Sequence, residues 1–218
     1  VHPYIQMIMD SELEKYILDH STPEDEILED LYRQTHIRFV NPNMSCGCLQ
    51  GKFLEMISRM ISPDCILEIG TYTGYSSICL ARGLKPGGVL ITAEPNDEIS
   101  EFTDQYLKKA GVYERIIRIT GRIQDVIGKI DRQPDLVYID GDKREYIEYY
   151  RIAIEKVKPG GFIIADNVLW GGKIVQTDTR DPQTRGIIEF NEMIRRQENI
   201  ENLILPLRDG IMLIRKKY

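Results

Sequence analysis

CILEIGTYTGYSS, residues 65–77, is the stretch that decides the fold class of this 218-residue chain. It begins with a short apolar run around one acid, Glu68, which is typical of a strand buried on both faces of a parallel sheet. Gly70 and Gly74 then interrupt the pattern, and a helical run starts at Ser76. A buried strand, a glycine turn and a helix in succession predict an α/β unit, in which a ligand binds where the strand ends.

The same alternation of apolar and helical runs continues downstream. Further strands are predicted at residues 89–93, 115–120, 136–139 and 162–165, and helices at 76–83, 99–110, 144–157 and 187–197. Two last strands, 202–205 and 211–214, flank the turn residues 208–210, which is a hairpin signal. The sequence therefore predicts a doubly wound, mostly parallel, Rossmann-like α/β sheet of seven strands with an antiparallel C-terminal hairpin.

Ahead of this unit, helical patterns occupy residues 10–19, 23–36 and 49–61, and a polar loop is predicted much later at 171–186. Residues 1–45 are expected to form a helical extension on one core domain, residues 46–218. Helical spacing in the third helix places five apolar residues on one face: Leu49, Phe53, Met56, Ile57 and Met60.

Composition excludes several classes of function. The formal net charge of −6 disfavours broad binding to nucleic acid. No apolar run approaches the length of a membrane span, and the N-terminus lacks a signal-peptide pattern, so we expect a cytoplasmic protein. The cysteines lack the paired spacing of a zinc site and are expected to stay reduced; they are Cys46, Cys48, Cys65 and Cys79.

Polar residues follow the first three strands, where a ligand is expected. The first turn spaces its glycines as G-x-x-x-G, without the third glycine of the dinucleotide fingerprint. Glu94, at the end of the second strand, is placed to accept hydrogen bonds from ribose hydroxyls. These features favour a nucleoside site. After the third strand, Gln124 and Asp125 are candidates either for an adenine edge or for capping the next helix.

Acidic residues follow the fourth and fifth strands. Asp140 ends one strand, and Asp166 with Asn167 ends its expected neighbour. Oxygen ligands that converge at one sheet edge suit a hard cation such as Mg²⁺, although polar residues also end strands without any function. Lys143 follows three residues after Asp140. Beside a dication it would have a depressed pKa and act as a base; the alternative is an ordinary surface lysine.

Together these motifs resemble the cation-dependent O-methyltransferases, the group that contains catechol and caffeoyl-CoA O-methyltransferases. The resemblance runs from about Asn41 to the C-terminus and rests on NMS (43–45), LEIGTYTGYS (67–76), YIDGDK (138–143), ADNVLW (165–170) and LPLRDG (205–210). It implies an S-adenosylmethionine (SAM)-dependent methyltransferase domain over residues 46–218. It also implies a divalent cation, Mg²⁺ first and Ca²⁺ or Mn²⁺ as alternatives, and a homodimer.

The resemblance implies a role for each matched residue. Lys143 matches the catalytic lysine, and the metal ligands are Asp140, Asp166 and Asn167, of which Asp140 also serves catalysis. Eight residues are expected around the methyl donor: Met44, Glu68, Gly70, Tyr72, Ser76, Glu94, Gln124 and Asp140. Asn41 and Trp170 are expected beside the acceptor.

The leading expectation is methyl transfer from SAM to a hydroxyl of a catechol-like small molecule. An alternative within the same family is methylation of 5-hydroxyuridine in tRNA, which the acidic composition disfavours. An NAD-dependent oxidoreductase would need the third glycine, and the only histidines lie in the extension: His2, His20 and His36. The complete set of two aspartates, an asparagine and a lysine disfavours a noncatalytic binding protein.

Overall fold

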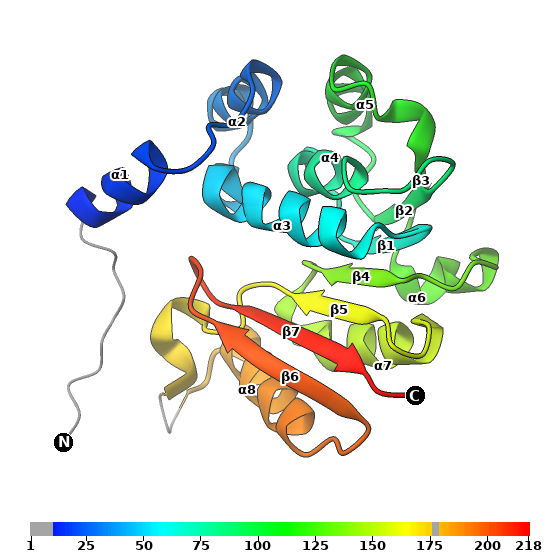
Figure 1. The fold of residues 1–218 in the computed structure, drawn as a ribbon. Helices are drawn as coiled ribbons and strands as arrows, with labels where there is room; N and C mark the ends of the chain where they lie inside the picture. The colour runs from blue at the N-terminus through cyan, green and yellow to red at the C-terminus, as the bar shows by residue number, and fades with distance from the viewer. Residues whose placement is uncertain (1–10, 176–178) are drawn as a thin grey trace.

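A computed structural model describes residues 11–175 and 179–218 of the chain (Figure 1). The first ten residues, with His2, lie outside the described part, as do residues 176–178 within the predicted polar loop. The described chain folds around one seven-stranded sheet of order β3-β2-β1-β4-β5-β7-β6. The predicted sheet of seven strands is therefore confirmed.

The strands follow the predicted order, with small differences at their ends. They are β1 (Cys65–Ile69), β2 (Val89–Glu94), β3 (Ile116–Thr120), β4 (Leu136–Ile139), β5 (Phe162–Ala165), β6 (Ile200–Leu205) and β7 (Ile211–Lys216). The first five strands pair in parallel, whereas β7 runs antiparallel to both β5 and β6. All five residues of β1 are buried, as its apolar run predicted.

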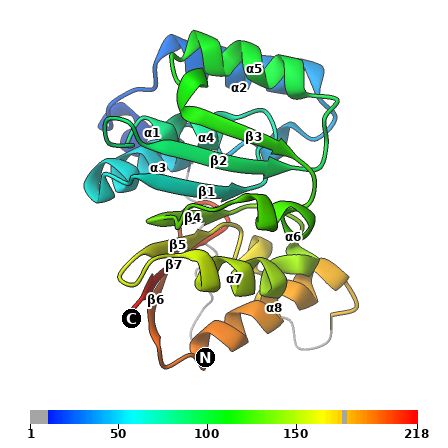
Figure 2. The ribbon, with the colours of Figure 1, turned by 90° about the vertical axis from the view of Figure 1, so that its right-hand side faces the viewer.

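Helices cover both faces of the sheet (Figures 1 and 2). They are α1 (Ser11–Asp19), α2 (Glu26–Arg38), α3 (Gly47–Ile61), α4 (Tyr75–Ala81), α5 (Ser100–Lys109), α6 (Ile123–Val126), α7 (Tyr146–Lys156) and α8 (Pro182–Arg195). One core layer joins the sheet to α6, α7 and α8, and the other joins it to α2, α3, α4 and α5. This double covering explains why the central strands are buried and largely apolar.

The last helix begins earlier than the sequence pattern predicted. The polar loop was expected to continue to residue 186, but α8 starts at Pro182. The Asp181 carboxylate accepts hydrogen bonds from the backbone N–H groups of Gln183 and Thr184, and so caps the first turn. An aspartate cap followed by proline at the first helical position is a strong helix start, and the polar character of the segment concealed it.

The apolar face of α3 is only partly covered, by contacts of Phe53 and Ile57 with the core. Met56 and Met60 are 57% and 78% exposed, and the other three residues of that face are only half-buried. The buried face instead carries Gln50 and Gly51. At Gly51, a Cβ atom would lie 2.5 Å from Cε1 of Tyr75 on α4. The close packing of α3 on α4 therefore selects the side of the helix with the glycine and turns the methionines outward.

The two N-terminal helices differ in how they meet the rest of the molecule. Leu28 and Leu31 of α2 are buried in the same core layer as α3 and α4. By contrast, Leu13 and Tyr16 of α1 are exposed. Within residues 11–175 and 179–218, none of the helices combines the length and apolar character needed to cross a bilayer.

Candidate active site

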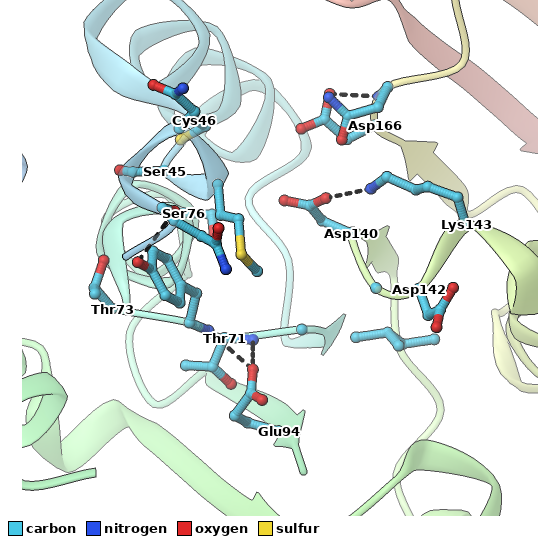
Figure 3. A pocket seen from close by; sticks show the side chains of 18 of the residues that line it. Ser45, Cys46, Thr71, Thr73, Ser76, Glu94, Asp140, Asp142, Lys143 and Asp166 are labelled. Carbon is cyan, nitrogen blue, oxygen red and sulfur yellow. Dashed lines mark hydrogen bonds and ion pairs between the residues drawn. The ribbon is translucent and has the colours of Figure 1, made fainter. Parts of the chain in front are cut away.

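A cavity of about 970 Å³ opens at the carboxyl ends of β1, β2, β4 and β5. This is where a ligand is expected in an open parallel sheet. Most of the predicted site residues line it: Asn41, Met44, Gly70, Tyr72, Ser76, Glu94, Asp140, Lys143, Asp166, Asn167 and Trp170. Figure 3 shows the turn after β1 on one wall and Asp140, Lys143 and Asp166 on the facing wall.

The turn after β1 is held in shape by the acid at the end of β2. Gly70 and Gly74 both have positive φ, at 96° and 86°. Glu94 Oε2 accepts hydrogen bonds from the backbone N–H groups of Thr71 at 3.1 Å and Tyr72 at 3.0 Å (Figure 3). The same carboxylate lines the cavity. Glu94 therefore stabilises the turn after β1. It also lies where the sequence predicted a hydrogen-bond acceptor for the ribose.

Gly70 also allows the two walls to meet. A Cβ atom there would lie 2.3 Å from the carbonyl oxygen of Asp140, far inside van der Waals contact. Backbone hydrogen bonds fix the approach from both sides, from Gly70 N–H to Ala93 and from Asp140 N–H to Ile69. Asp140 consequently stands directly beside the turn.

Glu68 does not line the cavity but supports a residue that does. Its side chain is fully buried and accepts hydrogen bonds from Ser76 Oγ at 2.6 Å and from Ser77 Oγ. It thereby ties β1 to the first turn of α4. Burial raises the pKa of Glu68 from 4.5 to about 7, although both serine hydrogen bonds oppose the rise.

The raised pKa of Glu68 makes stability depend on pH. The folded protein keeps this proton up to about pH 7, whereas the unfolded chain releases it near pH 4.5, so the favourable contribution is complete below 4.5 and is lost as the pH rises through 7. The free energy of unfolding of the parent, measured by urea denaturation, should fall by an amount on the order of 3 kcal/mol between pH 5 and 8.5 because of Glu68. Glu68→Gln is expected to remove this pH-dependent fall. Glu101→Gln, an exposed control on α5, should keep the parent profile. Parallel profiles for the parent and Glu68→Gln would contradict the assignment.

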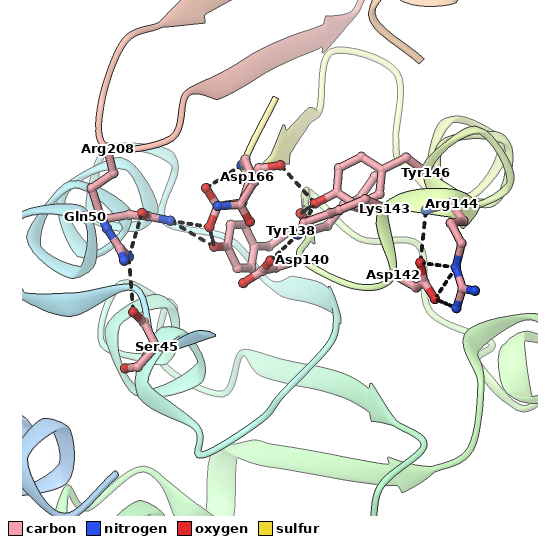
Figure 4. A network of polar contacts seen from close by, with 12 residues as sticks. Ser45, Gln50, Tyr138, Asp140, Asp142, Lys143, Arg144, Tyr146, Asp166 and Arg208 are labelled. Carbon is pink, nitrogen blue, oxygen red and sulfur yellow. Dashed lines mark hydrogen bonds and ion pairs between the residues drawn. The ribbon is translucent and has the colours of Figure 1, made fainter. Parts of the chain in front are cut away.

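Lys143 is buried in the opposite wall. It is 6% exposed, and its Nζ donates to Asp140 Oδ1 and to Tyr146 Oη, each at 2.8 Å (Figure 4). Burial alone would lower the pKa of Lys143, but the negative charge of Asp140, followed by Tyr146, raises it well above the usual range. The alternative of a surface lysine is wrong. The depressed pKa was predicted for Lys143 beside a bound dication, whose positive charge would act against the contact with Asp140, and it stays a prediction.

Asp166 and Asn167 complete the polar end of this wall. Asp166 is 2% exposed, and burial, followed by the negative charge of Asp140, raises its pKa to about 6. Asn167 adopts a left-handed backbone with φ of 54°. Within the described ranges, no group of three or more His, Cys, Asp or Glu side chains is arranged to hold a metal. Two carboxylates and one amide nevertheless fit the donor chemistry of a hard dication.

Sequence reasoning missed a polar cluster behind Asp166 (Figure 4). Asp166 Oδ2 accepts hydrogen bonds from Gln50 Nε2 at 2.6 Å and Tyr138 Oη at 3.1 Å. Arg208 Nη1 in turn donates to Gln50 Oε1 at 3.3 Å. One usable signal was Tyr138, the only side chain with a polar atom in the otherwise aliphatic strand β4. Gln50 and Arg208 gave none, because their contact joins distant parts of the chain.

The part of the cavity wall that follows β3 is formed by residues other than the predicted Gln124. Gln124 does not line the cavity; its Nε2 donates to Glu145 at 3.0 Å and Glu148 at 3.3 Å. Arg122, Ile123 and Glu145 line that part of the cavity instead. Asp125 lies inside α6 and does not cap it. The residues one and two positions earlier than Gln124 are therefore those that face the space expected for adenine.

The strand order, the antiparallel β7 and the cavity after β1 define a Rossmann-like methyltransferase architecture. Residues 18–217 match the family model described as O-methyltransferase. The chain is 32% identical over 170 residues to a catechol O-methyltransferase of Niastella koreensis, which covers 76% of this chain and 77% of the relative. It is 31% identical over 226 residues to a caffeoyl-CoA O-methyltransferase of Petroselinum crispum, with coverage of 96% and 92%.

Among solved structures, the chain is similar to the O-methyltransferase TomG from Streptomyces achromogenes, which is described as involved in tomaymycin synthesis and was solved in complex with SAM. The TM-score is 0.88 at 30% sequence identity, covering 95% of this chain and 96% of TomG. The chain belongs to the O-methyltransferase family. It is therefore an enzyme of the class that transfers methyl groups to oxygen, and the expectation drawn from its motifs is confirmed at that level.

Proposed function

We propose that the protein transfers a methyl group from SAM to one hydroxyl of a catechol-like small molecule, with a divalent cation held by Asp140, Asp166 and Asn167. The observation that carries the proposal is the position of Lys143. Its ammonium group is buried between Asp140 and Tyr146, in the same cavity as the turn after β1. The names of the catechol and caffeoyl-CoA relatives and the SAM complex of TomG support it.

The donor half of the cavity, formed by the turn after β1 and Glu94, would bind SAM and would not need to activate it chemically. SAM supplies a methyl group that is already activated on a sulfonium, so the task of the protein is to position it. Glu94 is placed to accept from ribose hydroxyls while it still holds the amides of Thr71 and Tyr72. Met44, at the end of a 3₁₀ turn (Pro42–Met44), lines the same space. Ser76, held by Glu68, completes this wall.

The acceptor half would bind the diol. Mg²⁺ is the first candidate for the cation and Mn²⁺ or Ca²⁺ the alternatives; a bound dication supplies Lewis acidity that lowers the pKa of a hydroxyl. Lys143 is placed to orient the acceptor oxygen and to take or steer its proton, because its Nζ lies in the cavity wall beside Asp140. Asn41 and Trp170 line the outer cavity, where the rest of the acceptor would lie.

The test is methyl transfer from SAM to a caffeoyl-type catechol and to hypomodified tRNA, each with and without EDTA. Methylation of the catechol is expected, with loss of activity in EDTA and recovery on adding Mg²⁺. The matched acceptor with a single ring hydroxyl should be a poor substrate, because it lacks the second oxygen of the diol. Activity that EDTA leaves unchanged would contradict the metal site, and activity on tRNA alone would replace the proposed acceptor.

The remaining proposals concern the assembly, the domain division and the location of the protein. We propose a homodimer, which light scattering on the purified chain would test. Division into a helical extension (1–45) and a methyltransferase domain (46–218) is likewise a proposal, as is a cytoplasmic location. The tRNA alternative has the weaker support, because the net charge of −6 disfavours a broad RNA-binding surface.

A further inference from the structure

The polar cluster behind Asp166 consists of Gln50, Tyr138 and Arg208, and hydrogen bonds join its side chains to one another. The reaction proposed above gives these three residues no role. Gln50 is fully buried on α3, and both ends of its amide have partners. Its Nε2 lies 2.6 Å from Asp166 Oδ2 and 3.2 Å from Tyr138 Oη, and its Oε1 accepts from Arg208 (Figure 4). A buried amide with all these contacts joins α3, β4 and the β6–β7 turn to the end of β5.

Arg208 determines which way the Gln50 amide points. A guanidinium group only donates hydrogen bonds, so the amide oxygen must face it and the amide nitrogen must face Asp166. Arg208 is itself anchored, because its Nη1 also donates to the backbone carbonyls of Ser45, at 3.1 Å, and Cys46. The backbone of Arg208 is left-handed, with a φ of 50°, a conformation that residues other than glycine rarely adopt.

The two oxygens of Asp166 are unequally occupied. Oδ2 accepts from both Gln50 Nε2 and Tyr138 Oη, which fills its two lone-pair positions. Among the residues that the structure describes, only the backbone N–H of Asn167 donates to Oδ1, at 2.7 Å. Oδ1 is therefore the oxygen of Asp166 that keeps a lone pair for a ligand.

We propose that Gln50 is a positioning residue for Asp166: it holds Oδ2 so that Oδ1 is presented to a divalent cation, and Arg208 fixes the direction of the Gln50 amide. This inference rests on the metal site of the proposed function. Groups that hydrogen-bond a metal ligand fix its orientation before the cation binds, which lowers the free-energy cost of ordering it. An apolar side chain at this position would remove the 2.6 Å contact and leave Asp166 Oδ2 with the Tyr138 hydroxyl as its donor.

The experiment is a Mn²⁺ titration of the full chain at constant pH, with free Mn²⁺ followed by electron paramagnetic resonance. Gln50→Met keeps the length of the side chain without its donor, and it is expected to weaken Mn²⁺ binding by about tenfold to a hundredfold. Affinity for S-adenosylhomocysteine, measured by calorimetry, should stay within about twofold of the parent, because the donor half of the cavity does not contact Gln50. In assays, the Mg²⁺ concentration for half-maximal rate should rise while the rate at saturating Mg²⁺ largely recovers.

Ser58→Ala is the matched control. Ser58 is also fully buried on α3, and its Oγ donates to the carbonyl of Leu80 at 2.7 Å, away from the cavity. The substitution should lower the thermal unfolding temperature while Mn²⁺ affinity stays at the parent value. A merely structural role for Gln50 predicts the same behaviour for Gln50→Met, and that result would overturn the proposal.

Arg208→Met keeps the proposal testable if Gln50→Met does not fold. Arg208 lies in an exposed turn, and its loss removes the donor that holds Gln50 Oε1, so the amide is fixed less firmly against Asp166. Weaker Mn²⁺ binding by about threefold to tenfold would support the proposal, and unchanged binding would overturn it. A parent protein that binds no Mn²⁺ would instead overturn the metal site of the proposed function, and this inference with it.

Discussion

Asp140→Asn is expected to lower kcat/KM for methyl transfer by roughly 10³-fold. The substitution keeps the shape of the side chain but removes the charge that faces Lys143 Nζ at 2.8 Å. An ammonium group buried to this extent would then lack its closest negative partner, which is costly. Because the backbone of Asp140 also abuts Gly70, the change falls at the junction of the donor and acceptor halves.

Initial rates with SAM and a caffeoyl-type catechol provide the measurement. Asp64→Asn is the control, because Asp64 precedes β1 at the opposite end of the sheet and pairs with Lys85 on the surface, at 3.2 Å. That variant should keep a rate within about twofold of the parent, since surface ion pairs contribute little to stability. If Asp140→Asn retained a rate within tenfold of the parent, its charge would have no part in the reaction.

Gly70→Ala is expected to abolish useful SAM binding, with a dissociation constant raised by about a hundredfold or more. The new Cβ would lie 2.3 Å from the carbonyl oxygen of Asp140, and both backbones are tied by strand hydrogen bonds. The ends of β1 and β4 must therefore separate where the turn meets Asp140. We also expect a loss of about 3 kcal/mol in the free energy of unfolding, typical of severe overpacking combined with positive φ.

Gly87→Ala is the control that separates the effect of the positive φ from the effect of overpacking. Gly87 also has a positive φ, of 77°, but a Cβ atom there meets nothing within 4 Å. It should lose about 1 kcal/mol of stability and keep the SAM affinity of the parent in calorimetry. Equal behaviour of the two alanine variants would show that the close approach to Asp140 is not what requires a glycine at position 70.

The fold class and most strand positions followed from patterns within a few residues of one another. The apolar run of β1, the glycines after it and the alternation with helices are local signals, and the described sheet has the predicted strands. The strand-end rule also brought the right side chains into one cavity, because parallel strands end at one edge. In this way Glu94, Asp140 and Asp166 were placed together from positions far apart in the chain.

The cluster behind Asp166 had no such signal. Gln50 and Arg208 are 158 positions apart, and neither stands at the end of a parallel strand. Their contact exists because the antiparallel turn between β6 and β7 returns to the N-terminal end of α3. The rule of parallel strand ends does not extend to a helix or to an antiparallel hairpin.

The sequence by itself determined the α/β class, the order of the elements and the cavity edge, because these depend on local periodicity and on strand direction. Only the tertiary structure decided which side of α3 is buried, since that depends on the fit of Gly51 against Tyr75. It also decided the surroundings of Lys143. The direction of its pKa shift depends on the balance between burial and the 2.8 Å contact with Asp140, and no spacing in the sequence encodes a distance.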